Sequence, residues 1–227
     1  MQAKDTADGS KTLFSPRYKQ TLHSHKGAVT ESKHVFLGES GCLERLEQGQ
    51  DANVLEVGFG TGLNFFLTAD AALRCKANLQ YLALEQDLLD AQTIRTLSYQ
   101  TYVSSELIAA YLSFREGLPR KAPHGLYTFE LENVRLELLI GEATEQSLPK
   151  NQFEVIYQDA FSPDANPELW TDAFFSKLYA SLKPGGVLST YSVKGEVRRR
   201  LQTVGFNVEK RAGPVGGKRE MLLAWRV

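Results

Sequence analysis

Asn53-Val54-Leu55-Glu56-Val57-Gly58-Phe59-Gly60-Thr61-Gly62-Leu63-Asn64-Phe65-Phe66 combines a strand, a glycine turn and the start of a helix. Val54, Leu55 and Val57 are the apolar run of a strand that is buried on both faces of a sheet. The three glycines allow a tight turn and let a ligand come into contact with the backbone. The free N–H groups at the start of the following helix point at the same place. These residues therefore predict an α/β fold with a ligand-binding loop at 58–62.

The spacing of the glycines distinguishes between classes of cofactor. A dinucleotide fold has Gly-x-Gly-x-x-Gly, which would put the third glycine at position 63, whereas Leu63 stands there and the glycine is Gly62. A phosphate-binding P-loop needs Gly-Lys-Ser/Thr, and no lysine follows the loop. The remaining pattern, Glu-x-Gly-x-Gly-x-Gly after a strand, is typical of class I methyltransferases, which use S-adenosylmethionine. A glycine turn alone also serves simply to join a strand to a helix.

Acidic residues stand at the ends of three further predicted strands. Glu85 ends the strand predicted at 79–85, where an acid can bind both hydroxyls of a ribose. Glu142 follows the third strand, where its carboxylate or the nearby backbone could bind an adenine amino group. Asp159 follows the fourth strand, at 153–158, where a transferable methyl group would lie. For each acid alone, a solvated side chain at a strand end is the favoured explanation, but three acids at neighbouring strand ends favour a ligand site, because ligands bind at that rim.

The rest of the chain predicts one α/β domain with a class I methyltransferase, Rossmann-like fold. We expect a mostly parallel seven-stranded sheet with an antiparallel hairpin at its C-terminal edge, because strands alternate with helices. Residues 1–11 are predicted to be a disordered tail and 12–227 the methyltransferase domain. Within it we expect an N-terminal β extension over 12–50, with a hairpin formed by 18–23 and 28–37, and a helical insertion over 86–130 that is too long for an ordinary connection. The other predicted elements are helices at 39–48, 63–75, 167–182 and 196–204, and strands at 126–131, 134–140, 187–192, 206–210 and 221–227.

Composition narrows the class of protein. The chain has 227 residues, 42% hydrophobic and 23% charged, which is ordinary for a globular domain. No run of about 18 uncharged apolar residues exists, so we expect no membrane span. Cys42 and Cys75 lack metal-ligand spacing and favour a reducing cytoplasm. His23, His25 and His34 lie near one another in the sequence, but no cysteine or carboxylate completes a site, so we expect no metal.

The charge of the chain is distributed unevenly. From Leu178 to Val227 there are ten basic and three acidic residues, a net charge of +7, which leaves −8 for the rest of a chain whose total is −1. A basic end on an acidic body suits a polyanion that approaches from one side. Solvated faces of a helix and a hairpin explain the same charges equally well.

Several motifs resemble the methyltransferase domain of the MnmC family, whose stand-alone form is called MnmD. They are Gly-Phe-Gly-Thr-Gly-Leu-Asn-Phe at 58–65, Asp-Ala-Phe-Ser-Pro-x-x-Asn-Pro-Glu-Leu-Trp at 159–170 and Gly-Lys-Arg-Glu-Met-Leu at 217–222, with Glu-Ser-Lys-His-Val-Phe-Leu at 31–37 resembling the start of the domain. The resemblance runs from about Ser15 to Trp225, and the insertion at 86–130 contributes no recognisable motif to it. It implies an MnmC/MnmD-type tRNA 5-methylaminomethyl-2-thiouridine methyltransferase without the FAD oxidase half, which would follow Val227.

The resemblance implies methyl transfer from S-adenosylmethionine to the amine of 5-aminomethyl(-2-thio)uridine at tRNA wobble position 34, giving 5-methylaminomethyl(-2-thio)uridine. The expected partners are the tRNA anticodon loop and, through a functional link, the enzyme that supplies the aminomethyluridine. Asp159 is the predicted catalytic residue, which could accept a hydrogen bond from the amine and take up a proton. The predicted cofactor residues are Glu56, Gly58, Phe59, Gly60, Thr61, Gly62, Asn64, Glu85, Glu142, Ala143 and Asp159. The predicted substrate residues are Phe161, Pro163, Tyr191, Lys218 and Arg219.

Three details of this interpretation leave alternatives open. Trp170 offers a face for a flat base, although a place in the core is favoured. Arg198, Arg199 and Arg200 could extend a track for phosphates beside Lys218. The same fold and acids would also serve a small-molecule, polyamine-type amine N-methyltransferase, or a non-catalytic protein with a cofactor fold that binds RNA.

Overall fold

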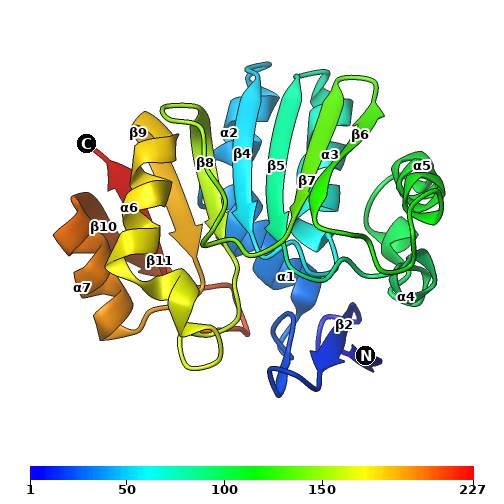
Figure 1. Cartoon of the computed structure of the whole chain (residues 1–227), viewed down its shortest axis with the longest axis horizontal. Coiled ribbons are helices and arrows are strands. Elements are labelled where there is room, and N and C mark those ends of the chain that lie inside the picture. The colour runs from blue at the N-terminus through cyan, green and yellow to red at the C-terminus, as the bar shows by residue number, and fades with distance from the viewer.

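A single central sheet organises the computed structural model, which describes residues 1–227. The order of its eight strands is β10-β11-β9-β8-β4-β5-β7-β6 (Figure 1). The strands are β4 (Ala52–Val57), β5 (Leu79–Glu85), β6 (Gly125–Leu131), β7 (Val134–Ile140), β8 (Phe153–Gln158), β9 (Leu182–Thr190), β10 (Phe206–Ala212) and β11 (Glu220–Arg226).

The sheet is parallel in the middle and antiparallel at both edges. β4 pairs in parallel with β5 and β8, and the parallel pairing continues to β7 on one side and β9 on the other. β10 and β11 form the expected antiparallel hairpin at one edge. The predicted count of seven strands is wrong by one, because β6 pairs with β7 along its whole length and extends the opposite edge. The 126–131 and 134–140 hairpin itself is confirmed.

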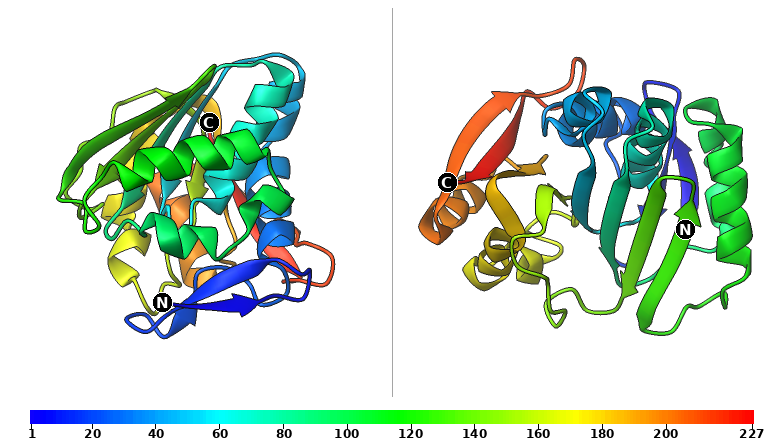
Figure 2. Two further views of the ribbon diagram at one scale, coloured as in Figure 1. Left: turned by 90° about the vertical axis from the view of Figure 1, so that its right-hand side faces the viewer. Right: turned by 90° about the horizontal axis from the view of Figure 1, so that it is seen from above.

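Helices cover both faces of the sheet (Figure 2). Alternating side chains of β4 point to opposite faces, so Val54 belongs to one hydrophobic core and Leu55 to the other. The first core contains Phe65 and Phe66 of α3, and the second contains Phe174 and Phe175 of α6. The helical elements are α1 (Ala28–Glu31), the π-helical segment η1 (Ser32–Gly38), α2 (Cys42–Glu47), α3 (Leu63–Cys75), α4 (Ala91–Arg95), η2 (Tyr99–Thr101), α5 (Ser105–Glu116), η3 (Pro167–Trp170), α6 (Asp172–Ser181) and α7 (Gly195–Val204).

The N-terminal region differs from the prediction in two ways. Residues 1–11 are not a disordered tail, because β1 (Gln2–Asp5) pairs with β2 (Lys11–Ser15) and β2 with β3 (Gln20–Thr21). The Asp8 carboxylate stabilises the turn between β1 and β2 by accepting from the backbone N–H groups of Ser10 and Thr30. The predicted strand at 28–37 is wrong as well, since these residues form α1 and η1. Their β-branched and aromatic side chains pack into the core against α3 and β9 in helical form.

The small sheet β1-β2-β3 lies beneath the central sheet (Figure 1). Its position brings residues 18–26 to the carboxyl ends of the central parallel strands, where they line a shared cavity. None of the helices has both the length and the hydropathy needed to cross a membrane. The fold therefore joins two parts that are distant in sequence, the N-terminal segment and the strand ends, around one hollow.

Candidate active site

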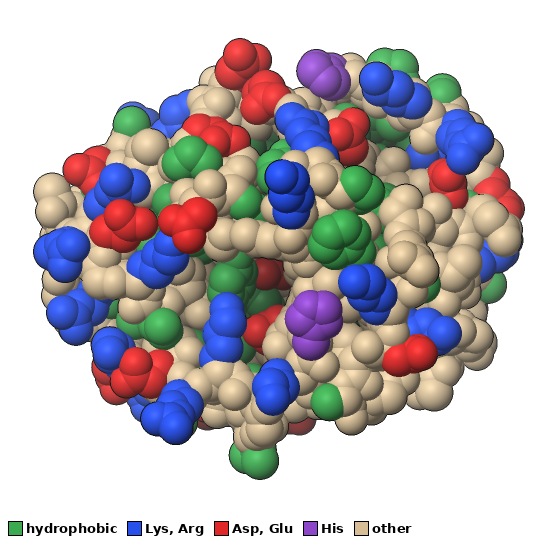
Figure 3. Space-filling model, turned by 90° about the horizontal axis from the view of Figure 1, so that it is seen from below, with side chains coloured by type: hydrophobic (Ala, Val, Ile, Leu, Met, Phe, Trp, Pro, Cys, Tyr) green, Lys and Arg blue, Asp and Glu red, His purple; other side chains and the backbone are tan.

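The main cavity has a volume of about 670 Å³ and lies at the carboxyl ends of β4, β5, β7 and β8. Gly58, Glu85, Gly141 and Asp159, which end or directly follow these four strands, all line it. Figure 3 looks onto this end of the molecule and shows a hollow with acidic side chains inside and Lys, Arg and His side chains around its mouth. The volume falls within the range of about 300–1,000 Å³ that is typical of small-molecule sites.

The glycine loop after β4 is shaped so that a side chain would not fit. Gly58 has φ +89°, and a Cβ atom there would lie 2.9 Å from the backbone oxygen of Asp159. Gly62 has φ +80° and stands at the N-terminus of α3. Glycine adopts this left-handed conformation without the steric cost that other residues incur. The glycine at position 58 therefore lets this loop pack closely against the backbone at the end of β8, and Gly58 and Gly60 line the cavity.

The Glu85 carboxylate is held in place by backbone N–H groups. Its Oε2 accepts from Gly60 at 2.8 Å, and its Oε1 accepts from Gln86 and Asp87, each also at 2.8 Å. Burial raises the pKa of Glu85, while the three N–H donors act in the opposite direction. The carboxylate thus links the glycine loop to the end of β5 and presents a fixed acceptor to the cavity.

A single amide behind the glycine loop joins the buried carboxylate of Glu56 to the half-buried carboxylate of Asp159. Asn64 Nδ2 donates to Glu56 Oε1 and to Asp159 Oδ2, both at 2.8 Å. Tyr81 donates its hydroxyl to the other oxygen of Glu56 at 2.9 Å. Burial raises the pKa of Glu56 to about 8. Burial, together with the charges of Glu56 and Glu31, raises the pKa of Asp159 well above its usual value, although the Asn64 hydrogen bond opposes this.

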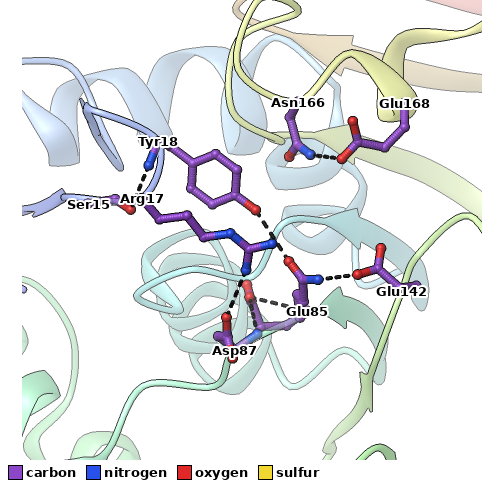
Figure 4. Close-up of polar contacts among 9 residues, drawn as sticks. Ser15, Arg17, Tyr18, Glu85, Asp87, Glu142, Asn166 and Glu168 are labelled. Carbon is purple, nitrogen blue, oxygen red and sulfur yellow. Dashed lines mark hydrogen bonds and ion pairs between the residues drawn. The ribbon is translucent and has the colours of Figure 1, made fainter.

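A segment that we call the strap, residues 17–22, lies along the cavity, which residues 18–22 line. Figure 4 shows its Arg17 and Tyr18 side chains reaching toward the residues that follow β5. On the β5 side, Tyr18 donates its hydroxyl to Gln86 Oε1 at 3.3 Å, and Arg17 forms an ion pair with Asp87 at 3.2 Å. The amide of Gln86 in turn donates to Glu142.

On the β8 side of the strap, the Tyr18 ring stacks on Phe161 with centroids 4.1 Å apart. Gln20 Nε2 also donates to Ser162 Oγ at 2.7 Å. The strap therefore forms part of the wall of the cavity and connects its two sides.

The structure brings most of the predicted site residues together. Those that line the cavity are Gly58, Phe59, Gly60, Glu85, Glu142, Ala143, Asp159, Phe161, Tyr191 and Lys218. Those that do not line it are Glu56, Thr61, Gly62, Asn64, Pro163 and Arg219.

Among the residues that do not line the cavity, Thr61 is fully buried and its hydroxyl accepts from Tyr99 at 2.6 Å. Arg219 is exposed beside the cavity. Glu56 and Asn64 touch the site only through Asp159 and each other.

The sequence did not predict the N-terminal part of the cavity wall or the two residues directly after β5. Tyr18, Glu31, Gln86 and Asp87 line it but were not predicted as site residues. Gln86 and Asp87 directly follow Glu85, so their position next to a strand-end acid was an available signal. Glu31 is the first residue of the motif at 31–37, although that motif alone carries no chemistry. Nothing in the sequence near Tyr18 indicates that it would reach the ends of β5 and β8.

Trp170 holds the loop after β8 in place from the core side. Its indole is fully buried, as favoured from the sequence, and donates to the backbone oxygen of Phe161 at 2.8 Å. Arg200 donates to the backbone oxygen of Trp170 at 2.8 Å, so its guanidinium is used within the fold. Arg198 and Arg199 are exposed on α7. Arg198, Arg199 and Arg219 are therefore the exposed arginines among the basic residues predicted to bind phosphates.

Residues 109–227 match the model of a protein family described as S-adenosyl-L-methionine-dependent methyltransferase. The chain belongs to this family. The cofactor of the methyltransferase is accordingly S-adenosylmethionine, as the glycine spacing predicts, and the class I Rossmann-like fold is confirmed by the central sheet.

The methyltransferase is also similar to longer curated proteins. It is 34% identical over 221 residues to the tRNA 5-methylaminomethyl-2-thiouridine biosynthesis bifunctional protein MnmC of Cupriavidus metallidurans, covering 94% of this chain and 32% of that protein. It is 33% identical over 220 residues to the protein of the same name from Pseudomonas putida, covering 92% of this chain and 32% of that protein. The chain thus spans about a third of the length of these curated relatives.

Solved structures share its fold. The methyltransferase superimposes on MNMC2 from Aquifex aeolicus with a TM-score of 0.80 and 29% identity, covering 99% of this chain and 70% of that one. A spermidine synthase from Thermotoga maritima matches with a TM-score of 0.53 and 16% identity, covering 100% of this chain and 72% of that one. The second likeness shows the fold alone.

Proposed function

We propose that this methyltransferase transfers a methyl group from S-adenosylmethionine to the amine of 5-aminomethyl(-2-thio)uridine at tRNA wobble position 34. The observation that carries the proposal is the position of Asp159, a half-buried carboxylate held by Asn64 at the end of β8 inside the cavity. Asp159 is the first residue of the motif at 159–170. The similarity to proteins named for tRNA 5-methylaminomethyl-2-thiouridine biosynthesis supports the same substrate.

The residues at the strand ends fit S-adenosylmethionine. The glycine loop lines the cavity with the backbone of Gly58 and Gly60, and its neighbour Glu85 offers a fixed carboxylate for the ribose hydroxyls. Glu142 and Ala143 line the adjoining part of the cavity, where the adenine would lie. When bound, the cofactor supplies a methyl group on a positively charged sulfur. Positioning both reactants in one cavity would provide much of the acceleration of such a displacement.

Asp159 would act on the acceptor amine. A nitrogen attacks the methyl group only through a free lone pair, so the amine must lose a proton before or during the transfer. The Asp159 carboxylate would accept a hydrogen bond from the amine, orient its lone pair and take up that proton. Asn64 keeps the carboxylate in place, because its amide donates to Asp159 Oδ2.

The surroundings of the cavity suit a base that is turned out of an RNA loop. Wobble bases lie in a single-stranded loop and can be stacked on aromatic side chains in a pocket. Phe161 and Tyr191 supply such rings in the cavity wall. Exposed basic residues such as Arg198, Arg199 and Arg219 would attract the RNA backbone, so tRNA binding should weaken with salt. The anticodon substrate would also place the enzyme in the cytoplasm.

Replacing Tyr18 by alanine should weaken the binding of S-adenosylmethionine roughly fivefold, with little change in thermal stability. The change removes the stacking on Phe161 and the hydrogen bond to Gln86, which together hold the strap against both strand ends. An aromatic pair of this kind contributes about 0.5–1.5 kcal/mol, and about 1 kcal/mol corresponds to that change in affinity. Isothermal titration calorimetry measures it. Tyr18→Phe keeps the stacked ring and should bind the cofactor nearly as well as the wild type. Equal affinity in the wild type and both variants would show that the strap does not contribute to cofactor binding.

Nucleoside mass spectrometry of tRNA from cells lacking this protein tests the function in vivo. The proposal predicts that 5-aminomethyl- or carboxymethylaminomethyl-uridine accumulates at the wobble position and that the methylaminomethyl nucleoside is lost. Returning the wild-type gene should restore the methylated nucleoside, and a gene encoding Asp159→Asn should not. An unchanged set of wobble nucleosides would contradict the proposal.

A further inference from the structure

A second carboxylate lines the cavity that holds Asp159. Glu31, at the end of α1, is 8% exposed, and the hydrogen bond to its carboxylate comes from the backbone N–H of Ser24 to Oε2 at 2.9 Å. Its Oε1 is left free to accept from a ligand. Glu31 lies on a helix of the N-terminal region. It belongs neither to the glycine loop nor to the strand-end acids, so the cofactor site described above does not explain its presence in the cavity.

The two carboxylates repel each other when both are ionised. The charge on Glu31 is one of the causes that raise the pKa of Asp159, and burial raises the pKa of Glu31 itself. Like charges in one cavity favour the uptake of a proton or a cation. A cavity of this kind therefore favours a positively charged ligand group over a neutral one.

One lysine of the chain, Lys218, places its own alkylammonium group in this cavity. Lys218 reaches the cavity from the loop between β10 and β11, and its Nζ lies 4.0 Å from the centroid of the Tyr191 ring. The residue is exposed as a whole, but its ammonium end is buried enough to lower its pKa, while the charges of Glu31 and Asp159 act to raise it. An alkylammonium thus lies against an aromatic face and is attracted by both acids.

We propose that Glu31, Asp159 and the face of Tyr191 form a subsite that binds the acceptor amine in its ammonium form. This inference rests on the proposed function and names the chemical class of acceptor, a primary alkylammonium. Alkylamines have a pKa of about 10, so the acceptor arrives with three protons on nitrogen at neutral pH. Glu31 and Asp159 bind the cation together, and Lys218 occupies the same electrostatic environment until the substrate enters.

The reaction balances in charge and protons. The ammonium gives one proton to a carboxylate of the pair, and the freed lone pair forms the N–C bond as the C–S bond breaks. The product leaves as a secondary ammonium, so one proton in total stays behind and passes to solvent. Other titratable groups that line the cavity near Glu31 are His23, His25, Lys26 and Tyr191, of which His23 is neutral because burial lowers its pKa to about 4.

Calorimetric titration with two nucleosides tests the subsite directly. The protein loaded with S-adenosylhomocysteine is titrated with 5-aminomethyluridine and with 5-hydroxymethyluridine, which has a similar shape and no positive charge. The wild type should prefer the amine by at least about tenfold, since hydrogen bonds to charged groups contribute about 1.5–3 kcal/mol. Glu31→Gln keeps an acceptor for the Ser24 N–H and should lose this preference while binding the cofactor normally, and Glu31→Asp should recover part of it. Glu47→Gln, at an exposed acid of α2 outside the cavity, should behave as the wild type.

The pH dependence of kcat/KM in a Lys218→Met protein is a second test. A purely structural role of Glu31 would not affect it. The positive charge of Lys218 lowers the pKa of Glu31 and Asp159, so its removal should move the acidic limb of kcat/KM to higher pH. A Glu31→Gln protein with an unchanged amine preference and an unchanged pH profile would overturn the subsite, even if tRNA is methylated. A wild type that methylates no tRNA but shows a Glu31-dependent amine preference would instead contradict the proposed function and support the subsite.

Discussion

Asp159→Asn should lower kcat for methyl transfer by about 10²- to 10⁴-fold, the range expected for the loss of a general base. The amide cannot take up the proton of the amine, although it is nearly the same size and can still accept from Asn64. The affinity for S-adenosylmethionine should change by less than about tenfold, because hydrogen bonds to the neutral amide remain available. Transfer of labelled methyl to substrate tRNA measures the first quantity, and calorimetry measures the second.

The change of kcat/KM with pH tests the same role of Asp159. Burial and neighbouring carboxylates raise the pKa of Asp159, so the active carboxylate form is lost as the pH falls through this raised value. The wild-type kcat/KM should therefore rise with pH from an acidic limb, and Asp159→Asn should lack the part due to this group. Asp164→Asn changes an exposed acid of the same loop that pairs with Lys194, and it should retain wild-type kinetics. A fully active Asp159→Asn protein would show that another group receives the proton.

Glu85→Gln should weaken the binding of S-adenosylmethionine by about 10- to 100-fold. Hydrogen bonds to a charged group contribute about 1.5–3 kcal/mol, and the neutral side chain would turn an NH₂ group toward backbone N–H donors or toward the ligand. The backbone donors at Gly60, Gln86 and Asp87 all point at the present carboxylate. At saturating cofactor the rate of transfer should fall much less, because Glu85 lies at the end of β5 and Asp159 at the end of β8.

Calorimetric titration of the cofactor against the purified variant measures this effect. Glu145→Gln, at an exposed acid that does not line the cavity, is the matched control and should bind as the wild type does. An unchanged dissociation constant for Glu85→Gln would mean that the ribose lies elsewhere and that Glu85 only joins the glycine loop to β5.

The centre of the fold was predictable because its signals are local. The strand, glycine loop and helix at 53–75 correspond to β4 and α3, and the strand predicted at 79–85 matches β5 residue for residue. The strand-end acids could be placed in one site from sequence because carboxyl ends of parallel strands meet at one edge. Glu85, Glu142 and Asp159 accordingly line the same cavity.

The N-terminal part was not predictable in the same way. The run from 28 to 37 has β-branched and aromatic residues, but long-range packing against α3 and β9 makes it helical, and tertiary packing of this kind overrides local propensity. The strap reaches the loop after β8 through a contact such as Gln20 to Ser162, which are 142 residues apart in the chain. Short sequence motifs carry no information about contacts between residues so far apart in the chain. The positions of Tyr18 and Glu31 in the cavity therefore could be found only from the structure.

Methyl transfer by the purified protein tests the central claim most directly. The protein is incubated with methyl-labelled S-adenosylmethionine and tRNA that carries 5-aminomethyluridine at the wobble position, and the digested nucleosides are separated by mass. The account predicts label in 5-methylaminomethyluridine from position 34, with none when that position carries unmodified uridine. Label in another nucleoside, or in no nucleoside while small alkylamines are methylated, would contradict it.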